Sequence, residues 1–526
     1  MSDLASSGSG TVAASGRVPA RERSMAYKLL VAVTMLLANI MNYADRSVLS
    51  VLAEPMKADL GITDAQIGVL YGTSFVLLNA LTGIALARLA DNWLRNRLLG
   101  IGVAFWSLMT ALSGLASGYT QLALARVGVG VGEATISPIG HAMLADLFEA
   151  KQRSRAFSIY LAGPFVGSAL CIAVGGWILG SWPDACGTYG LCSIKGWQIV
   201  FILFGLPGLV IAVLAWLLGE PADDIERRKS GRPIADTFRE LSNIIPPFSF
   251  VRLLQGGGRQ AARANIKLTA ILTAIAAVLI WLTGDILQWV LVAIGVQSAG
   301  SWIQGLKRRD PDLYHLTVGS RAFAFAALAM AGPSVVAGSI GFWGVPLALR
   351  TFNLAPEEAG KTLGLAIGAG ALLGTLAGGF LGDFLRRRIG ATAPLWIGFG
   401  ALIGSAALFG LLVNAPSLQS YALILGMIMA LGGLWTAPSG TLPQELVLPS
   451  MRARGAAIYA LTLTLIAMST GPYAVGRLSD VFGSLTLGLG AMYLLIPVSA
   501  VFTILSARAF PEALRLREEM AKAARG

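Results

Sequence analysis

Charged side chains are scarce in this chain. Asp, Glu, Lys and Arg make up 13% of its 526 residues, whereas 55% of the residues are hydrophobic. A soluble domain carries about 25% charged residues, so the composition excludes a protein that water surrounds on all sides. Histidine and cysteine are scarcer still, with two and three copies. The two histidines, His141 and His315, lie far apart in the sequence and are poor candidates for catalysis, so we do not expect an enzyme. Two histidines and three cysteines are also too few for a metal cluster, so we do not expect a metal site.

The sequence contains many long runs of apolar residues. Runs of about 17 to 25 apolar residues predict helices that cross a membrane. The first run is too long for a signal-peptide core and lacks a small-residue cleavage site, so we expect it to remain as the first span. The sequence therefore predicts an all-α integral membrane protein with twelve spans in two sets of six, at 27–53, 64–89, 98–118, 121–146, 153–181, 197–219, 321–349, 358–382, 390–413, 419–444, 454–478 and 486–509.

The formal net charge of +12 is explained by topology. Lys and Arg stand in short clusters between the apolar runs, and such clusters collect in cytoplasmic loops of membrane proteins. The loops 113–119 and 414–420, which lie at the other ends of the spans, contain no basic residue. We therefore expect no nucleic-acid partner, both termini in the cytoplasm, and a position in the plasma membrane, which is the inner membrane of a bacterium.

A long segment separates the two sets of spans. Residues 220–265 are polar and basic and contain Pro246 and Pro247, as a cytoplasmic connection does. Residues 266–304 are apolar again and are interrupted at Gly284 and Asp285. Because both flanks are basic, the segment must cross the membrane an even number of times. We favour an inserted hairpin of two short spans; a helix pair lying on the cytoplasmic surface is the alternative.

The two halves of the chain repeat each other in the same direction. An acidic residue precedes a basic cluster after the second span and again after the eighth, and the acidic and basic residues after the fourth span recur 299 positions later, after the tenth. Gly163-Pro164 in the fifth span matches Gly471-Pro472 in the eleventh. Two parallel six-helix halves are a transporter architecture, in which the substrate site lies between the halves near the membrane midplane.

With these motifs the chain resembles the major facilitator superfamily over residues 27–509. Within it, three motifs together resemble the spinster family of lipid exporters: Asn42-Tyr43-Ala44-Asp45-Arg46, Arg126 with Gly130 to Ala134, and Ala145 to Phe148 followed by Gln152 to Arg155. The resemblance implies the major facilitator fold, with two six-helix bundles in a parallel pseudo-twofold repeat. The extra helix pair is not expected of the family.

This organisation divides the chain into five parts. We expect a disordered cytoplasmic N-terminus (1–26), an N-terminal six-helix bundle (27–219), a cytoplasmic linker with the apolar hairpin (220–320), a C-terminal six-helix bundle (321–509) and a cytoplasmic tail (510–526).

Three charged residues inside the spans are the main candidates for transport. A charge within a membrane costs at least about 2.5 kcal/mol, so Asp45, Arg126 and Glu133 each require a partner or a water-filled path. Asp45 and Arg126 lie at similar depths, whereas Arg126 and Glu133 are seven residues, or about 10.5 Å, apart on one helix. We hypothesise that both carboxylates compete for Arg126 and exchange protons, while Arg126 also meets an anionic headgroup. A static salt bridge between two spans is the alternative.

Other residues are expected to support this group or to act elsewhere. Asn42, Tyr43 and Arg46 flank Asp45; for Arg46 a structural role is an equal alternative. Cys186 and Cys192 lie in one outer loop and form either a disulfide or two free thiols. The charges at the cytoplasmic ends are predicted to form a gate that breaks when the halves rock: Asp91, Arg95, Asp146, Arg153, Arg155, Asp383, Arg386, Arg387, Arg388, Glu445, Arg452 and Arg454.

The resemblance implies a proton-coupled secondary transporter of an amphipathic anionic lipid, such as a lysophospholipid or a sphingolipid-like molecule, acting by alternating access. No cofactor is expected, the proton gradient is the expected driving force, and the chain is expected to act as a monomer in the bilayer. The alternative is a major facilitator proton symporter of small organic anions. It would need a second cationic residue within the C-terminal spans, where almost none occurs away from the helix ends. The internal repeat argues against a channel.

Overall fold

The computed structural model describes residues 24–218 and 248–523, together with 238 and 242. For the helical residues 84, 91–92, 150–151, 154, 252–253 and 256–258 only the backbone is described. This part of the chain consists of helices and the loops that join them, and it contains no strand. The predicted all-α architecture is confirmed. Residues 1–23 of the predicted N-terminus, much of the linker up to 247 and the last three residues of the tail lie outside the described residues.

The N-terminal bundle contains the first six predicted spans. The second span is built from α2, a π-helical turn (η1) and α3, and the fourth from α5 and α6. The elements are α1 (Met25–Leu60), α2 (Asp64–Tyr71), η1 (Thr73–Leu77), α3 (Leu78–Asn92), α4 (Arg95–Ser113), α5 (Tyr119–Glu133), α6 (Ile136–Leu147), α7 (Ala150–Tyr189) and α8 (Gly196–Leu217).

Two long helices and a short one follow before the C-terminal bundle: α11 (Phe248–Thr283), α12 (Ile286–Arg309) and α13 (Pro311–Leu316). The C-terminal bundle repeats the pattern, and its eleventh span is again interrupted by a π-helical turn (η4). Its elements are α14 (Arg321–Phe352), α15 (Pro356–Ile389), η2 (Gly390–Thr392), α16 (Ala393–Leu412), α17 (Leu418–Ser439), α18 (Leu442–Leu446), η3 (Pro449–Met451), α19 (Arg452–Leu463), η4 (Thr464–Met468), α20 (Gly471–Phe482), α21 (Leu485–Ala491), η5 (Met492–Leu494) and α22 (Leu495–Ala523).

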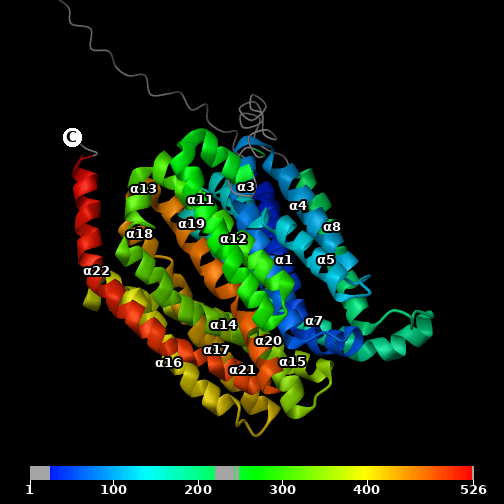
Figure 1. The fold of residues 1–526 in the computed structure, drawn as a ribbon. Coiled ribbons are helices and arrows are strands. Elements are labelled where there is room, and N and C mark those ends of the chain that lie inside the picture. Colours follow the sequence, from blue (N-terminus) through cyan, green and yellow to red (C-terminus); the bar gives the residue numbers. More distant parts are fainter. Residues whose placement is uncertain (1–23, 219–237, 239–241, 243–247, 524–526) are drawn as a thin grey trace, which may run out of the picture.

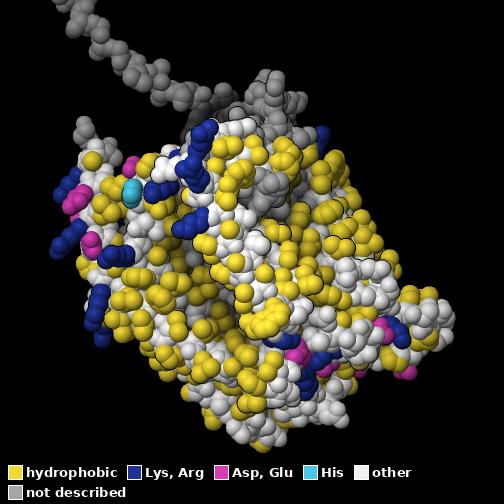
Figure 2. All heavy atoms as spheres, in the orientation of Figure 1, with side chains coloured by type: hydrophobic (Ala, Val, Ile, Leu, Met, Phe, Trp, Pro, Cys, Tyr) yellow, Lys and Arg dark blue, Asp and Glu magenta, His cyan; other side chains and the backbone are white. Residues whose placement is uncertain are grey.

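The length and composition of these helices suit a membrane. Within the described residues, 12 segments are long and apolar enough to cross one; Pro356–Leu412 contains both α15 and α16, and α4 is not among the 12. Both helices of the linker are included, as Arg259–Thr283 and Ile286–Arg309. Figure 2 shows apolar side chains over the middle of one face and charged side chains gathered towards its two ends. A helix satisfies its backbone hydrogen bonds internally, as hydrocarbon requires.

The bundles share a core in only one half of the molecule. We call the membrane face at which α1 begins the amino face and the face at which it ends the opposite face; the described parts of both termini lie at the amino face (Figure 1). One core cluster joins the bundles towards the opposite face, where Leu52 of α1 and Trp343 of α14 both belong to it. Towards the amino face the core divides into one cluster within each bundle. The structure is therefore closed at the opposite face.

Glycines allow the helices to approach closely enough for this packing. On α15, a Cβ atom at Gly374 would lie 1.9 Å from the backbone oxygen of Ala430 in α17, and one at Gly370 would lie 2.2 Å from that of Gly426. Across the two bundles, Gly360 of α15 faces Gly176 of α7 in the same way. Small residues at such crossings are typical of membrane helix pairs.

Candidate functional site

The buried Arg126 of α5 lies against Asp45 of α1. Its Nη1 atom lies 3.4 Å from each carboxylate oxygen of Asp45, and its Nη2 atom lies 3.5 Å from the Asp45 backbone oxygen. The side chains are 0% and 4% exposed. A charged hydrogen bond usually measures about 2.7 to 2.9 Å, so this pair is loose. The partnership of Asp45 and Arg126 suggested by their similar depths is present in the structure.

A second pair connects the same two helices. Arg46 Nε donates a hydrogen bond to Glu133 Oε2 at 3.0 Å; the Arg46 side chain is 21% exposed and that of Glu133 is fully buried. Side chains on a helix lean towards its N-terminus, so the long Arg46 side chain extends from α1 towards the amino face, where Glu133 lies. The hypothesis that Asp45 and Glu133 share Arg126 therefore needs a correction, because in this conformation Glu133 is bonded to Arg46.

Phe75 lies between the two guanidinium groups. Its ring centroid is 4.8 Å from the Cζ atom of Arg46 and 5.4 Å from that of Arg126. The ring stands on the π-helical turn η1, a type of distortion that often marks functional sites. An aromatic face attracts a cation, so one ring contributes to holding two like charges close together.

Several polar atoms of this group have no protein partner. Among the described residues, buried atoms without a hydrogen-bond partner include Arg126 Nε, Glu133 Oε1 and Asn42 Nδ2. Tyr43 is half-buried, and its ring centroid lies 4.9 Å from Arg46 Cζ. Open donors and acceptors beside loosely held charges can accept water, a proton or an anion. Only Arg46 combines a charge with partial exposure, so an incoming anion would meet it first.

The opposite face is closed by an ion-pair cluster that the sequence analysis missed. Arg350, at the end of α14, donates to Glu54 of α1 at 2.7 and 2.9 Å and to Asp64 of α2 at 2.6 and 2.8 Å. Lys57 also pairs with Asp64. Ser479 of α20 donates to the same carboxylate at 2.7 Å. These contacts join the two bundles. The sequence contains a signal for this cluster, since Arg350 ends one span and two acidic residues flank the loop after the first.

Among the described side chains, three of the predicted gate arginines form ion pairs, two of them within a bundle and one with the linker. Arg95 pairs with Asp146 in the N-terminal bundle, and Arg386 pairs with Glu445 at 2.6 Å in the C-terminal bundle. Arg454 pairs with Asp310 at the end of α12. The side chain of Asp91 is not among those described. The other members lie at the amino face: Arg153 donates to the Ala145 oxygen at 2.7 Å, Arg388 stacks on Phe384, and Arg155, Asp383, Arg387 and Arg452 are exposed.

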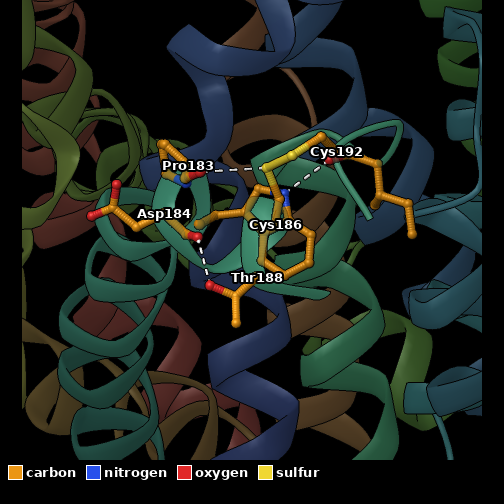
Figure 3. The surroundings of a disulfide bond; sticks show 7 residues. Pro183, Asp184, Cys186, Thr188 and Cys192 are labelled. Carbon is orange, nitrogen blue, oxygen red and sulfur yellow. Dashed lines mark hydrogen bonds between the residues drawn. A yellow bond between two sulfur atoms is a disulfide. The ribbon is translucent and has the colours of Figure 1, made fainter. Parts of the chain in front are cut away.

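A disulfide joins Cys186, near the end of α7, to Cys192 in the loop between α7 and α8 (Figure 3). Pro183 lies one turn earlier, and its backbone oxygen contacts the Cys186 sulfur at 3.4 Å. Gly190, with a φ of 66°, allows the tight return of the chain between the two cysteines. The third cysteine, Cys171, is buried in α7 and free. No group of three or more potential metal ligands occurs in the described part of the chain.

The arrangement matches known membrane transporters. The model of the Major Facilitator Superfamily matches residues 35–472. An MFS-type efflux pump of Mycolicibacterium smegmatis is 29% identical over 87% of this chain and 85% of its own, and Protein spinster of Drosophila melanogaster is 25% identical over 88% and 64%. A probable L-galactonate transporter of Escherichia coli is 31% identical over 39% and 43%.

A solved structure shows the same fold. The crystal structure of a bacterial homolog to the human lysosomal transporter Spinster, in an inward-facing and occupied conformation, superposes with a TM-score of 0.68 at 22% identity and covers 93% of this chain and 99% of its own. The major facilitator fold implied by the resemblance is confirmed. The chain is similar to spinster proteins. It belongs to the major facilitator superfamily and is a multi-pass membrane transporter, not an enzyme.

Proposed function

We propose that the chain is a proton-coupled secondary transporter of an amphipathic anionic lipid, with a lysophospholipid or a sphingolipid-like molecule as the substrate class. The observation that carries the proposal is the Arg46–Glu133 pair, in which a fully buried carboxylate depends on a partly exposed guanidinium. A substrate anion that binds Arg46 takes the cation from Glu133. A buried carboxyl group without a cation favours its neutral form, so Glu133 then takes up a proton.

Asp45 and Arg126 complete the charge balance of this scheme. Two carboxylates and two guanidinium groups have no net charge together, and the added anion is balanced by the added proton. The loose contact between Asp45 and Arg126, at 3.4 Å, leaves the Arg126 guanidinium able to take part in binding the headgroup. Anion and proton move together, in the direction that their combined gradients set. The proton gradient is the proposed driving force, and no cofactor is required.

The distribution of charge supports an amphipathic substrate. The charged pairs near the middle of the spans belong to the N-terminal bundle, whereas the charged residues of the C-terminal bundle lie near the ends of their helices. A headgroup on the arginines would therefore place an acyl chain against apolar side chains of the other bundle. A second candidate is a small organic anion, favoured by the similarity to the L-galactonate transporter.

The membrane orientation belongs to the same proposal. The basic clusters at the amino face support a cytoplasmic position for that face, and the disulfide supports an oxidising compartment at the opposite face. We propose the bacterial inner membrane as the location, with both termini in the cytoplasm, and a monomer as the working unit. The α11–α12 hairpin is proposed to cross the membrane, because α11 exposes a long apolar surface with Trp281 at its tip.

The test uses purified protein in liposomes that contain a trapped pH dye. Lysophospholipid or a six-carbon sugar acid is added to wild type, Asp45→Asn, Glu133→Gln and the control Glu358→Gln, which makes the same change at an exposed site of α15. Proton movement on lipid addition that is lost in Glu133→Gln and kept in Glu358→Gln supports the proposal. Proton movement with the sugar acid alone would replace the lipid with the second candidate. Lipid transfer without proton flux, unchanged in both site variants, would overturn the coupling.

A further inference from the structure

The helices α11 and α12 form a rigid unit that the twelve-span fold does not require. Asn265 of α11 donates to Ser301 at 2.9 Å and to Gln304 at 3.1 Å, and it accepts from Gln297 at 2.9 Å, all three on α12. Asn265, Ser301 and Gln297 are buried. Hydrogen bonds of this kind hold membrane helices together. The pair therefore moves as one body.

Helix α12 meets both bundles at one buried point. Gln288 of α12 is fully buried, and its Oε1 atom accepts a hydrogen bond from Thr73 at 2.5 Å. The Thr73 hydroxyl also contacts the backbone oxygen of Ser469 at 2.5 Å. Thr73 opens the π-helical turn η1 of the N-terminal bundle, and Ser469 directly follows the π-helical turn η4 of the C-terminal bundle. Figure 1 shows α12, in green, in front of the boundary between the bundles.

The contacts of α12 continue from this point towards the opposite face. Tyr473 of α20 donates a hydrogen bond to Asp285 at 2.7 Å, and its ring packs edge-on against Trp289 with centroids 5.5 Å apart. On the N-terminal bundle, Leu287 packs into a cluster with residues of α2. On the other side of Gln288, towards the amino face, Leu77 of η1 occupies the space beside Gly295, where an added Cβ would lie 2.2 Å from its Cδ1 atom.

These contacts bear on the transport cycle. When the opposite face opens, the second span must separate from the eleventh, because Ser479 and Asp480 of α20 bind the start of α2 there. Helix α12 is bonded to both spans and can follow only one of them. We infer that the α11–α12 hairpin is a brace that favours the conformation closed at the opposite face, and that Gln288 is its central positioning residue. The inference is independent of which substrate is carried.

The experiment measures the conformational equilibrium without any substrate. Spin labels are placed at Thr120 and Gln419, exposed positions of the two bundles at the opposite face, and a second pair at Glu149 and Gln444 at the amino face. Gln288→Leu keeps the side-chain size and leaves the Thr73 hydroxyl bonded to Ser469. One lost hydrogen bond between membrane helices should raise the ratio of opposite-face-open to closed molecules about threefold. The ratio of molecules with a short distance between the amino-face labels to molecules with a long distance should rise by the same factor.

A second variant and a control keep the test decisive if Gln288→Leu does not fold. Tyr473→Phe removes the bond to Asp285 and should cause a shift in the same direction. Ile275→Ala changes the exposed surface of α11, where the side chain is 50% exposed, and should leave both distance distributions unchanged. Monodisperse protein with unchanged distributions in Gln288→Leu and Tyr473→Phe would overturn the inference. An equal shift in Ile275→Ala would also overturn it, because the effect would then not arise from contacts with the bundles.

Discussion

Replacing Arg350 with methionine should open the opposite face. Arg350 is the member of the ion-pair cluster that comes from the C-terminal bundle, whereas Glu54 and Asp64 both come from the N-terminal bundle. Methionine is similar in length but supplies no charge or donor. In the closed conformation it would leave two carboxylates close together, with Lys57 as the nearby cation. When the opposite face opens, Arg350 moves away from both carboxylates with the C-terminal bundle. Its ion pairs therefore exist only in the closed conformation, and the substitution destabilises chiefly that state.

The size of the effect follows from the burial of the cluster. Removing one partner from a buried ion pair costs about 3 to 5 kcal/mol, whereas an exposed pair contributes about 0 to 1 kcal/mol. Arg350 and Glu54 are 28% and 29% exposed and Asp64 is 3% exposed, so an intermediate cost of about 2 kcal/mol is appropriate. Because about 1.4 kcal/mol corresponds to a factor of ten, the ratio of open to closed molecules should rise about 30-fold.

Spin labels at Thr120 and Gln419 measure this ratio directly as a longer distance between the bundles. The control is Lys361→Met, which removes an exposed ion pair with Glu357 within α15 on the same face. It should leave the distances unchanged, because both of its partners belong to one helix. If Arg350→Met gave the wild-type distance distribution in folded protein, the cluster would not determine the closure of this face and the reasoning would be refuted.

Three further predictions concern the helix packing, the site and the disulfide. Gly374→Leu should lower the free energy of unfolding by at least about 3 kcal/mol, because the added side chain meets the backbone of α17. In the control Gly379→Leu the side chain enters open space, so thermal unfolding should change little. Phe75→Leu removes the ring beside two guanidinium groups and should destabilise the fold by about 2 kcal/mol, whereas Phe75→Tyr should not. Replacing Cys186 and Cys192 with serine should cost about 2 kcal/mol for a loop of this size without reducing transport; lost transport would show that the loop has a further role.

The spans were predictable because hydrocarbon imposes a simple rule on the sequence. A helix that crosses the membrane must be long and apolar, and the repeated loop motifs then identify the two halves. The pairing of Asp45 with Arg126 was also predictable, since it depends only on depth in two antiparallel spans. The partner of Glu133 was not, because it depends on the direction in which the long Arg46 side chain leans, and sequence spacing does not include that direction.

Neutral residues account for another feature that the sequence did not reveal, the contact of α12 with the second span. Thr73 and Gln288 carry no charge, so nothing in the pattern distinguishes them from other polar residues in an apolar helix. The two Gly-Pro pairs also looked alike in the sequence. In the structure α7 continues through Pro164, whereas Pro472 stands in the first turn of α20, where its missing N–H group costs no helical hydrogen bond.

The central claim is that an anion takes Arg46 from Glu133 and that Glu133 then binds a proton. The most direct measurement adds lysophospholipid to purified protein in weakly buffered detergent and follows the pH with an indicator dye. Wild type and Glu358→Gln should take up about one proton per protein on binding, and Glu133→Gln should bind the lipid with no uptake. Lipid binding without proton uptake by wild type, or the same uptake by Glu133→Gln, would contradict the account.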